Sequence, residues 1–319
     1  MMYNRGLQRG MIHMLIVFGS INMDMVVEPE YLPQAGETVL CQDYDLFPGG
    51  KGANQALAAA RMGAKVALVG RVGGDYYSQQ ILATIRRQGV MTSGVGESER
   101  PTGCAMIIRE SGGKNRIIVA GGANNEAKAD QVPDEILRPD SMILTQGEVP
   151  PEEIFMLIRR AHERGVRVIL NCAPAFTIPE DIFRMLWILV VNEIEIGQVG
   201  KGLNLPAAAP PEMAKALAQK GRITCIVTLG EKGSVVVQPD GALFHVSALP
   251  IEKVVDTTGA GDAYCGTLSA CLYGGMNLED SVRWAAAAGS LACTREGTIN
   301  AFAFQDDIRD HLDQVKVTR

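Results

Sequence analysis

Short apolar segments alternate along the chain with longer segments in which apolar residues recur at helical spacing. The apolar segments are bounded by glycine or polar residues, which is typical of buried strands. The strands that this pattern predicts are 14–18, 65–70, 141–145, 166–170, 187–191 and 223–229. The helices that it predicts are 52–62, 75–88, 151–164, 211–220, 260–273, 278–294 and 304–315. Apolar strands that alternate with helices indicate an α/β fold, in which an open and mainly parallel sheet lies between layers of helices.

Two segments depart from this rhythm. Residues 23–47 and 102–119 alternate in polarity and contain proline and glycine turn signals, among them a Ser-Gly-Gly sequence at 111–113. We therefore expect extra strands that form a small β-sheet lid beside the main sheet. No stretch between the predicted elements has the composition of a flexible linker. The pattern predicts a single domain over residues 15–319, preceded by a loose extension over residues 1–14.

The composition is that of an ordinary globular protein and excludes some classes of partner. Of the 319 residues, 47% are hydrophobic and 21% are charged, and the net charge is −6. No overall basic field therefore attracts nucleic acid or anionic lipid. The 8 Phe, 7 Tyr and 2 Trp residues are few beside 35 Gly, whereas a stacking surface for single-stranded nucleic acid needs many aromatic side chains. We expect no nucleic-acid partner, and any phosphate group must be bound at a local site.

The sequence also predicts where the protein resides. The longest apolar run, 185–191, is far shorter than the roughly 20 residues of a membrane-spanning helix. Residues 1–14 contain no apolar stretch of the kind that a secretory signal requires. The seven cysteines include no Cys-x-x-Cys pair, so neither a zinc ribbon nor a disulfide framework is indicated. These features predict a cytoplasmic protein with reduced thiols and no membrane partner.

Several well-known catalytic motifs are absent from the sequence. It contains no G-x-x-x-x-G-K-[ST] loop, no G-x-S-x-G turn and no G-x-G-x-x-G fingerprint after a predicted strand. The first strand is followed by Gly-Ser-Ile-Asn at 19–22 instead, which argues against a dinucleotide-dependent dehydrogenase. The histidines lie far from the glycine-rich turns. A general base in this protein is therefore expected to be a carboxylate.

A glycine-rich turn directly before the predicted helix 260–273 carries the strongest chemical signal. Gly259 and Gly261 flank Ala260, and glycine lets the backbone turn so that consecutive N–H groups point to one spot at the helix N-terminus. Such a spot binds an anion, and Asp262 lies beside it in the first helical turn. An anion site next to a carboxylate base fits phosphoryl transfer to a hydroxyl group. Alternatively, Asp262 only caps the helix, a role that aspartate favours.

A second glycine-rich turn, residues 47–55, leads into the predicted helix 52–62. Its glycines, Gly50 among them, allow a ligand to approach the backbone closely. Asn54 offers both donors and acceptors for sugar hydroxyl groups. A tight turn that packs an alanine-rich helix on the sheet also explains the glycines, but it does not explain Asn54. Lys51 is expected to be solvated rather than to bind phosphate.

Polar residues follow several predicted strands at the point where each strand ends. Asn22 and Asp24 follow the first strand and alternate, so both side chains face one pocket if the segment is extended. Either residue also forms turns. Further polar clusters follow later strands, at 146–148, 192–195 and 228–230. Open α/β sheets bind ligands at the carboxyl ends of their strands, so a single crevice accounts for these clusters better than separate loops do.

The two glycine-rich turns resemble the two signatures of the PfkB carbohydrate kinase family. The first is Gly49-Gly50-Lys51-Gly52-Ala53-Asn54-Gln55-Ala56 with Arg61-Met62-Gly63, and the second is Asp256-Thr257-Thr258-Gly259-Ala260-Gly261-Asp262. Their order and separation make the pair far more specific than either turn alone. Residues 19–24 and 120–124 are similar to the ribokinase branch of that family, and the similarity runs from about residue 15 to the C-terminus.

The resemblance implies a ribokinase-like fold and transfer of the γ-phosphoryl group of ATP to the primary hydroxyl of D-ribose, which gives D-ribose 5-phosphate and ADP. By the family's pattern Asp262 is the catalytic base, and the backbone at Gly259, Ala260 and Gly261 stabilises the transferring group. The residues that the resemblance assigns to the sugar are Asn22, Asp24, Gly50, Asn54, Glu148 and Asp262. Those that it assigns to ATP are Asn192, Thr228, Gly230 and Gly261.

The resemblance also implies two cofactors and a homodimer. Glu195 is expected to order the water shell of Mg²⁺. A monovalent cation, usually K⁺, is expected in a loop that matches Asp256, Thr258, Ala292, Arg295 and Gly297. Ala301 stands where a serine hydroxyl often completes that site, so we expect weaker cation dependence. Two subunits are expected to pair through the exposed strand edges of the lid.

Other functions stay open on the sequence alone. Relatives with the same signatures phosphorylate nucleosides or other sugars, and Met23 and Met25 beside Asn22 and Asp24 favour a base-bearing substrate. A non-catalytic sugar- or nucleotide-binding regulator is less favoured, because Asp262 and its glycine turn are intact.

Overall fold

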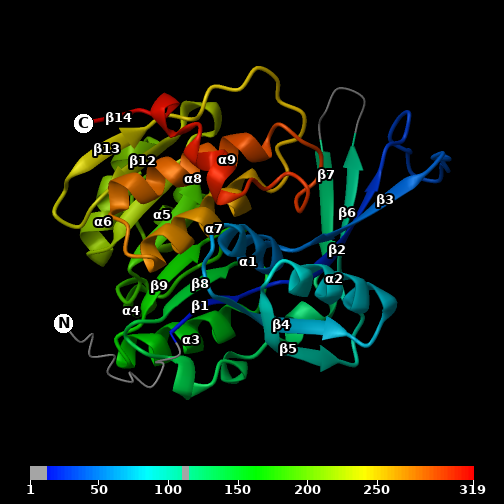
Figure 1. Cartoon of the computed structure of the whole chain (residues 1–319), viewed down its shortest axis with the longest axis horizontal. Helices are drawn as coiled ribbons and strands as arrows, with labels where there is room; N and C mark the ends of the chain where they lie inside the picture. Colours follow the sequence, from blue (N-terminus) through cyan, green and yellow to red (C-terminus); the bar gives the residue numbers. More distant parts are fainter. Residues whose placement is uncertain (1–12, 110–114) are drawn as a thin grey trace, which may run out of the picture.

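The computed structural model describes residues 13–109 and 115–319 of the chain. A large sheet lies between two layers of helices, and a small sheet stands at one side (Figure 1). This architecture confirms the predicted α/β fold with a mainly parallel sheet. Residues 1–12 of the predicted extension and the Ser-Gly-Gly turn at 111–113 lie outside the described residues.

The large sheet has ten strands in the order β14-β13-β12-β11-β10-β9-β8-β1-β4-β5. They are β1 (Leu15–Phe18), β4 (Val66–Gly73), β5 (Met91–Ser98), β8 (Met142–Gln146), β9 (Arg167–Asn171), β10 (Ile188–Asn192), β11 (Thr224–Thr228), β12 (Ser234–Val237), β13 (Leu243–Val246) and β14 (Val317–Thr318). Neighbours from β5 to β11 are parallel, whereas β12, β13 and β14 pair antiparallel at one edge. The hydrophobic pattern misses β5, β12, β13 and β14 because these strands are short or lie near a sheet edge, where polar residues interrupt the pattern.

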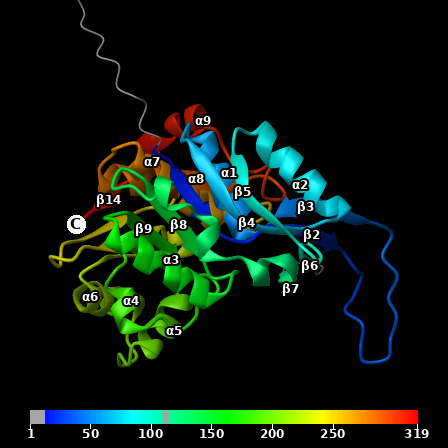
Figure 2. The same cartoon turned by 90° about the horizontal axis from the view of Figure 1, so that it is seen from below.

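Helices cover both faces of the large sheet (Figure 2). They are α1 (Lys51–Arg61), α2 (Tyr76–Arg87), α3 (Pro151–Glu163), α4 (Glu180–Phe183), α5 (Glu195–Gly202), α6 (Pro210–Gly221), α7 (Ala260–Tyr273), α8 (Leu278–Ala292) and α9 (Gln305–Arg309). Single turns of 3-10 helix occur at Gly122–Glu126, Ala129–Gln131, Asp134–Ile136, Gly230–Lys232 and Leu312–Gln314. The predicted helix 304–315 is shorter than expected, in a segment rich in aspartate, which has low helix propensity.

The alternation of side chains along β1 shows why both helix layers are needed. Leu15 and Val17 belong to one core, with α1, α2, α7 and α8, whereas Ile16 and Phe18 belong to the other, with α3, α4, α5 and α6. All of these β1 side chains are fully buried. Each apolar strand is thus covered on both faces, as parallel sheets require.

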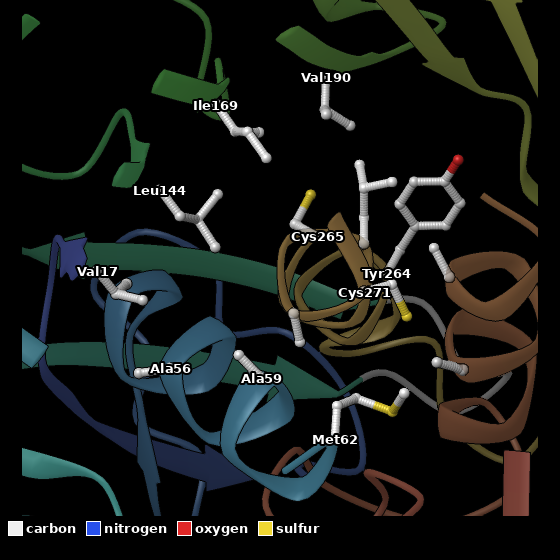
Figure 3. Packing of buried hydrophobic residues seen from close by; sticks show 14 of the residues in the cluster. Val17, Ala56, Ala59, Met62, Leu144, Ile169, Val190, Tyr264, Cys265 and Cys271 are labelled. Carbon is white, nitrogen blue, oxygen red and sulfur yellow. The ribbon is translucent and has the colours of Figure 1, made fainter. Parts of the chain in front are cut away.

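Small side chains let α1 and α7 pack closely against each other and against the sheet. Ala56 of α1 and Cys265 of α7 lie in the same buried cluster (Figure 3). A Cβ atom on Gly266 of α7 would lie 2.5 Å from the Gln55 carbonyl oxygen and 2.6 Å from the Ala58 Cβ. Only glycine fits at this contact. The contact fixes, side by side, the N-terminal turns of the two helices that carry the glycine-rich signatures.

The small sheet has the strand order β3-β2-β6-β7 and forms the lid. Its strands are β2 (Asn22–Val27), β3 (Tyr44–Gly49), β6 (Gly103–Arg109) and β7 (Asn115–Ala120). The β2 and β6 strands are parallel, and the other neighbours are antiparallel. Strand β2 continues from the carboxyl end of β1, and β3 leads directly into α1. The lid is therefore joined to the main sheet where ligands bind in this class of fold.

No helix among residues 13–109 and 115–319 combines the length and the apolar character that crossing a membrane requires.

Candidate active site

The structure brings the two glycine-rich signatures together through the Asp262 carboxylate. Asp262 lies in the first turn of α7 and is 6% exposed. Its Oδ2 accepts a hydrogen bond from the Asn54 side chain at 3.0 Å, and its Oδ1 accepts one from the Gln55 side chain at 2.9 Å. Both partners belong to α1, so the carboxylate is held by the other signature. The N-cap of α7 is Gly259 and no side chain makes a cap hydrogen bond there, so the structure does not support the alternative that Asp262 caps this helix.

Backbone conformation creates the turn in front of Asp262. Gly259 has φ 78°, a left-handed conformation that favours glycine. A Cβ atom there would lie 2.8 Å from Cγ2 of Thr298. The Ala260 N–H donates to the Thr257 carbonyl at 3.3 Å, and a Cβ atom on Gly261 would face open space. The first turn of α7 is therefore open to a ligand at Gly261.

Two of the predicted sugar residues, Asn22 and Glu148, are fixed by hydrogen bonds from neighbouring loops. The Asn22 side chain accepts a hydrogen bond from Asn124 at 2.7 Å. Glu148 Oε2 accepts from the Ser20 hydroxyl at 2.6 Å and from the Lys51 N–H at 3.2 Å. These contacts pre-organise polar groups at the ends of β1 and β8.

The predicted sugar residues Gly50 and Asn54 lie directly beside the others. Gly50 has φ 89°, and a Cβ atom there would lie 2.7 Å from the Asn22 nitrogen. Asn54 is 4% exposed, and its Oδ1 atom has no hydrogen-bond partner among the described residues. An unpaired buried amide oxygen is costly, and a sugar hydroxyl would satisfy it.

Asp24 stands on the lid strand β2 and is 7% exposed. Burial, together with the carboxylates of Glu148 and Asp262, raises the pKa of Asp24 to about 7, while the Lys51 ammonium opposes the shift. A Cβ atom on Gly49 would overlap the Asp24 carboxylate, at 2.1 Å from Oδ2. The glycine at the end of β3 thus makes room for this carboxylate inside the lid.

Lys51 does not behave as a solvated lysine, contrary to the expectation from sequence. It is the first residue of α1 and is half-buried. The Asp262 carboxylate raises the pKa of its ammonium group; burial opposes this shift, and Glu148 and Glu195 reinforce it. The ammonium therefore adds positive charge to an otherwise acidic site.

The residues that the resemblance assigns to ATP lie at the ends of β10 and β11. The Asn192 Oδ1 accepts the Glu195 N–H at 2.8 Å, and Glu195 Oε2 accepts the Asn192 N–H at 2.9 Å, so the two residues lock each other. Burial raises the pKa of Glu195. Thr228 ends β11, where its hydroxyl donates to a β10 carbonyl at 3.4 Å. Gly230 follows with φ 58° and open space around its Cα.

The predicted cation loop converges on Asp256. Its Oδ1 accepts the Thr258 N–H at 2.9 Å, and its Oδ2 accepts the Gly297 N–H at 3.2 Å. The lid residue Arg109 places a guanidinium nitrogen 3.3 Å from the same Oδ2. Burial opposes ionisation, but hydrogen bonds from Thr258 and Gly297 and the Arg109 charge hold the pKa of Asp256 below its usual range.

The other members of the predicted cation site lie in the chain segment that contains Gly297. Ala292 ends α8 and is fully buried, and the next residue, Cys293, accepts the Val255 N–H at 2.8 Å. Arg295 is exposed. Ala301 is 2% exposed and brings no hydroxyl group.

Three polar residues behind the site, Gln55, Gln146 and Asn171, have no role predicted from the sequence, although Gln55 and Gln146 belong to segments that the sequence marks as candidates. Gln55 and Gln146 are fully buried, and Asn171 is 7% exposed. Each ends a strand or follows a glycine turn, which is the available signal, but only the fold shows that their side chains meet. Met23 and Met25 were expected to favour a base-bearing substrate, but Met23 is buried in the core, and Met25 alternates with Asp24 onto the other face of β2.

Taken together, the fold and the site define a phosphotransferase that acts on a hydroxyl group. The comparisons with known proteins agree. Residues 12–304 match the family described as pfkB family carbohydrate kinase. The chain belongs to this family.

Individual relatives within the family are ribokinases. The ribokinase of Schizosaccharomyces pombe is 33% identical over 90% of this chain and 94% of its own length. The crystal structure of ribokinase from Thermotoga maritima has a TM-score of 0.87 and 31% identity, and covers 95% of this chain and 100% of that chain. Arabidopsis thaliana ribokinase, complexed with ribose and ATP, has a TM-score of 0.83 and 30% identity, and covers 94% of this chain and 98% of that chain.

Proposed function

We propose that the protein transfers the γ-phosphoryl group of ATP to the primary hydroxyl of D-ribose, giving D-ribose 5-phosphate and ADP. The observation that carries this proposal is the buried Asp262 carboxylate, which joins the two signatures of a carbohydrate kinase family. The ribokinases among its relatives support ribose as the substrate. An ATP-consumption assay with ribose, adenosine, fructose and 2-deoxyribose tests it. Turnover of adenosine but not of ribose would overturn it.

Different residues of the site carry out different parts of the reaction. Asp262 accepts the proton of the sugar hydroxyl while the hydroxyl oxygen bonds to the γ-phosphorus and the bond from that phosphorus to ADP breaks. The backbone from Gly259 to Gly261 and the Lys51 ammonium stabilise negative charge on the transferring group. The lid closes over the sugar and excludes water, which would otherwise accept the phosphoryl group.

Nucleotide binding falls to Asn192, Thr228, Gly230 and Gly261, and Glu195 faces the phosphate end. Among the residues that the structure describes, no group of three or more His, Cys, Asp or Glu side chains is placed to hold a metal ion. This donor set fits Mg²⁺ that arrives with ATP and keeps several waters, which a single carboxylate such as Glu195 orders. When bound, Mg²⁺ neutralises charge on the phosphate groups.

We expect Asn54→Ala to weaken ribose binding more than catalysis. The substitution removes hydrogen bonds to the sugar that are present in both the ground state and the transition state, so KM for ribose should rise by about tenfold. Because Asn54 also donates to Asp262 Oδ2, kcat should fall as well, but by less than KM rises. Steady-state kinetics at saturating ATP measures both. Asn277→Ala, which removes a helix cap at α8, is the control. An unchanged KM would exclude Asn54 from the sugar site.

The Asp256 loop is proposed to bind K⁺, and its oxygen donors suit a hard cation. Arg109 already shares the negative charge of Asp256, and Ala301 lacks a hydroxyl. We therefore expect K⁺ to raise Tm and activity only modestly relative to tetramethylammonium at equal ionic strength, and Ala301→Ser to enlarge both effects. Strong activation of the unmodified protein, or no effect of the serine, would contradict this prediction.

A homodimer through the lid is proposed as well. On the lid face opposite Asp24, Met25 and Leu46 continue into Met106 and Ile118, which are 48% and 62% exposed. A second lid would cover this apolar row. Light scattering that gives the mass of a single chain would contradict the dimer.

All seven cysteines are free thiols, which supports the expected cytoplasmic location.

A further inference from the structure

A chain of buried amide groups lies directly behind Asp262. Gln55 Nε2 donates to Asp262 Oδ1 at 2.9 Å and to Asn171 Oδ1 at 3.0 Å. Gln55 Oε1 accepts from Gln146 Nε2 at 2.8 Å. Both amide hydrogens and the carbonyl oxygen of Gln55 are thus engaged. Its side chain has one orientation that satisfies these partners.

The far ends of this amide chain are anchored in the main sheet. Asn171 ends β9, and its Nδ2 donates to the Val190 carbonyl of β10 at 3.2 Å, which fixes the orientation of the Asn171 amide. Gln146 ends β8, and its Oε1 has no hydrogen-bond partner among the described residues but is closely packed, since a Cβ atom on Gly19 would lie 2.0 Å from it. The partners of Gln55 therefore stand at the ends of β8 and β9, which pair in parallel, and β9 pairs in parallel with β10.

The two oxygens of Asp262 have different surroundings. Oδ1 faces Gln55, which is fully buried. Oδ2 faces Asn54, whose own Oδ1 is unpaired and is proposed to meet the sugar. Each oxygen thus accepts one hydrogen bond from an uncharged amide. The donor at Oδ1 is buried away from the proposed sugar, so it can hold the carboxylate in place while Oδ2 meets the substrate. An amide also cannot take up the proton that the base accepts.

We propose that Gln55 is a positioning residue, which holds Asp262 through Oδ1 so that Oδ2 points at the sugar hydroxyl. This inference rests on the proposed function and deepens it. Gln55 contacts neither the sugar nor ATP in this arrangement and acts only through Asp262. Its loss is therefore expected to reduce turnover without weakening substrate binding, since small displacements of a reacting group lower rates steeply.

The test compares Gln55→Met with the unmodified protein. Methionine has a similar length and no donor, so kcat should fall by about 10–100-fold, while KM for ribose and for ATP should stay within about twofold. Gln146→Met, one step further along the amide chain, should lower kcat less. Gln131→Met is the matched control, because Gln131 also donates through its side-chain amide, to the backbone carbonyls of Gly70 and Gly94. Its kcat should not change.

The split between kcat and KM separates positioning from a general structural role, because a general disturbance of the site would change both constants, whereas a displaced base lowers kcat alone. If Gln55→Met fails to fold, Gln55→Glu decides, since an ionised glutamate accepts hydrogen bonds but donates none to Asp262, and kcat should fall in the same way.

The outcomes are distinguishable. An unmodified protein that does not phosphorylate ribose would overturn the proposed function itself. An active protein in which the Gln55 variants keep kcat would overturn the positioning role. The positioning role is equally excluded if the Gln55 variants change kcat and KM together.

Discussion

Replacing Asp262 with asparagine should lower kcat by about a hundredfold or more, because the general base is lost while the shape of the side chain is kept. An amide cannot accept the hydroxyl proton at neutral pH. Ribose binding, measured by calorimetry, should persist, since the other polar groups at the ends of β1 and β8 are unchanged. Steady-state kinetics and calorimetry together measure the two effects.

The matched control for this substitution is Glu153→Gln. Glu153 is also a buried carboxylate, 7% exposed, but it accepts its hydrogen bonds from Ala129 and Lys128 on the other side of the sheet. Its replacement should reduce stability and leave kcat unchanged. Near-normal turnover of Asp262→Asn would remove Asp262 from the role of base.

Replacing Asp24 with asparagine should make the protein more stable at pH 8 and a poorer binder of ribose. The pKa of Asp24 is about 7 in the folded protein and has an ordinary value of 3.8. Folding therefore takes up a proton between these values, and the stability of the unmodified protein falls as pH rises from about 4 to about 7. The ionised group costs on the order of 2–4 kcal/mol at pH 8, and asparagine avoids this cost.

Urea unfolding at pH 4.5 and at pH 8 measures this difference. The variant and the unmodified protein should be similar at pH 4.5, and the variant should be the more stable at pH 8. Asp45→Asn, on the exposed part of the lid strand β3, is the control and should shift neither value. A variant that is less stable than the unmodified protein at pH 8 would contradict the account of Asp24.

Much of the fold follows from the sequence because its parallel strands are apolar on both faces. Strands such as β1 and β8 are covered by helices on either side, so the apolar runs are unbroken and easy to locate. The antiparallel strands β12 to β14 escape detection because each is short and they lie at one end of the sheet. The alternation of polar and apolar residues predicts the lid strands, but it does not show what each face of the lid contacts. The structure shows that Met25 and Asp24 lie on opposite faces of β2.

The candidate site is predicted in part for a similar reason. Asp262 and Asn54 each lie in a glycine-rich turn that by itself indicates a ligand site. The structure places the Asn54 Nδ2 atom 3.0 Å from the Asp262 Oδ2 atom. Lys51 and Gln55 lie in the first glycine-rich turn, but that turn does not predict their partners, and Arg109 has no local signal. Their roles depend on which charges and amides the tertiary fold brings close, and sequence spacing does not encode these distances.

Phosphorylation of the primary hydroxyl of ribose at this site is tested most directly by ³¹P and ¹³C NMR of the product. The unmodified protein with Mg²⁺, ATP and ribose should give ADP and a single phosphomonoester on C5 of the sugar, and Asp262→Asn should give almost none in the same time. Phosphate on another carbon, or no sugar phosphate at all while a nucleoside is phosphorylated, would contradict the account.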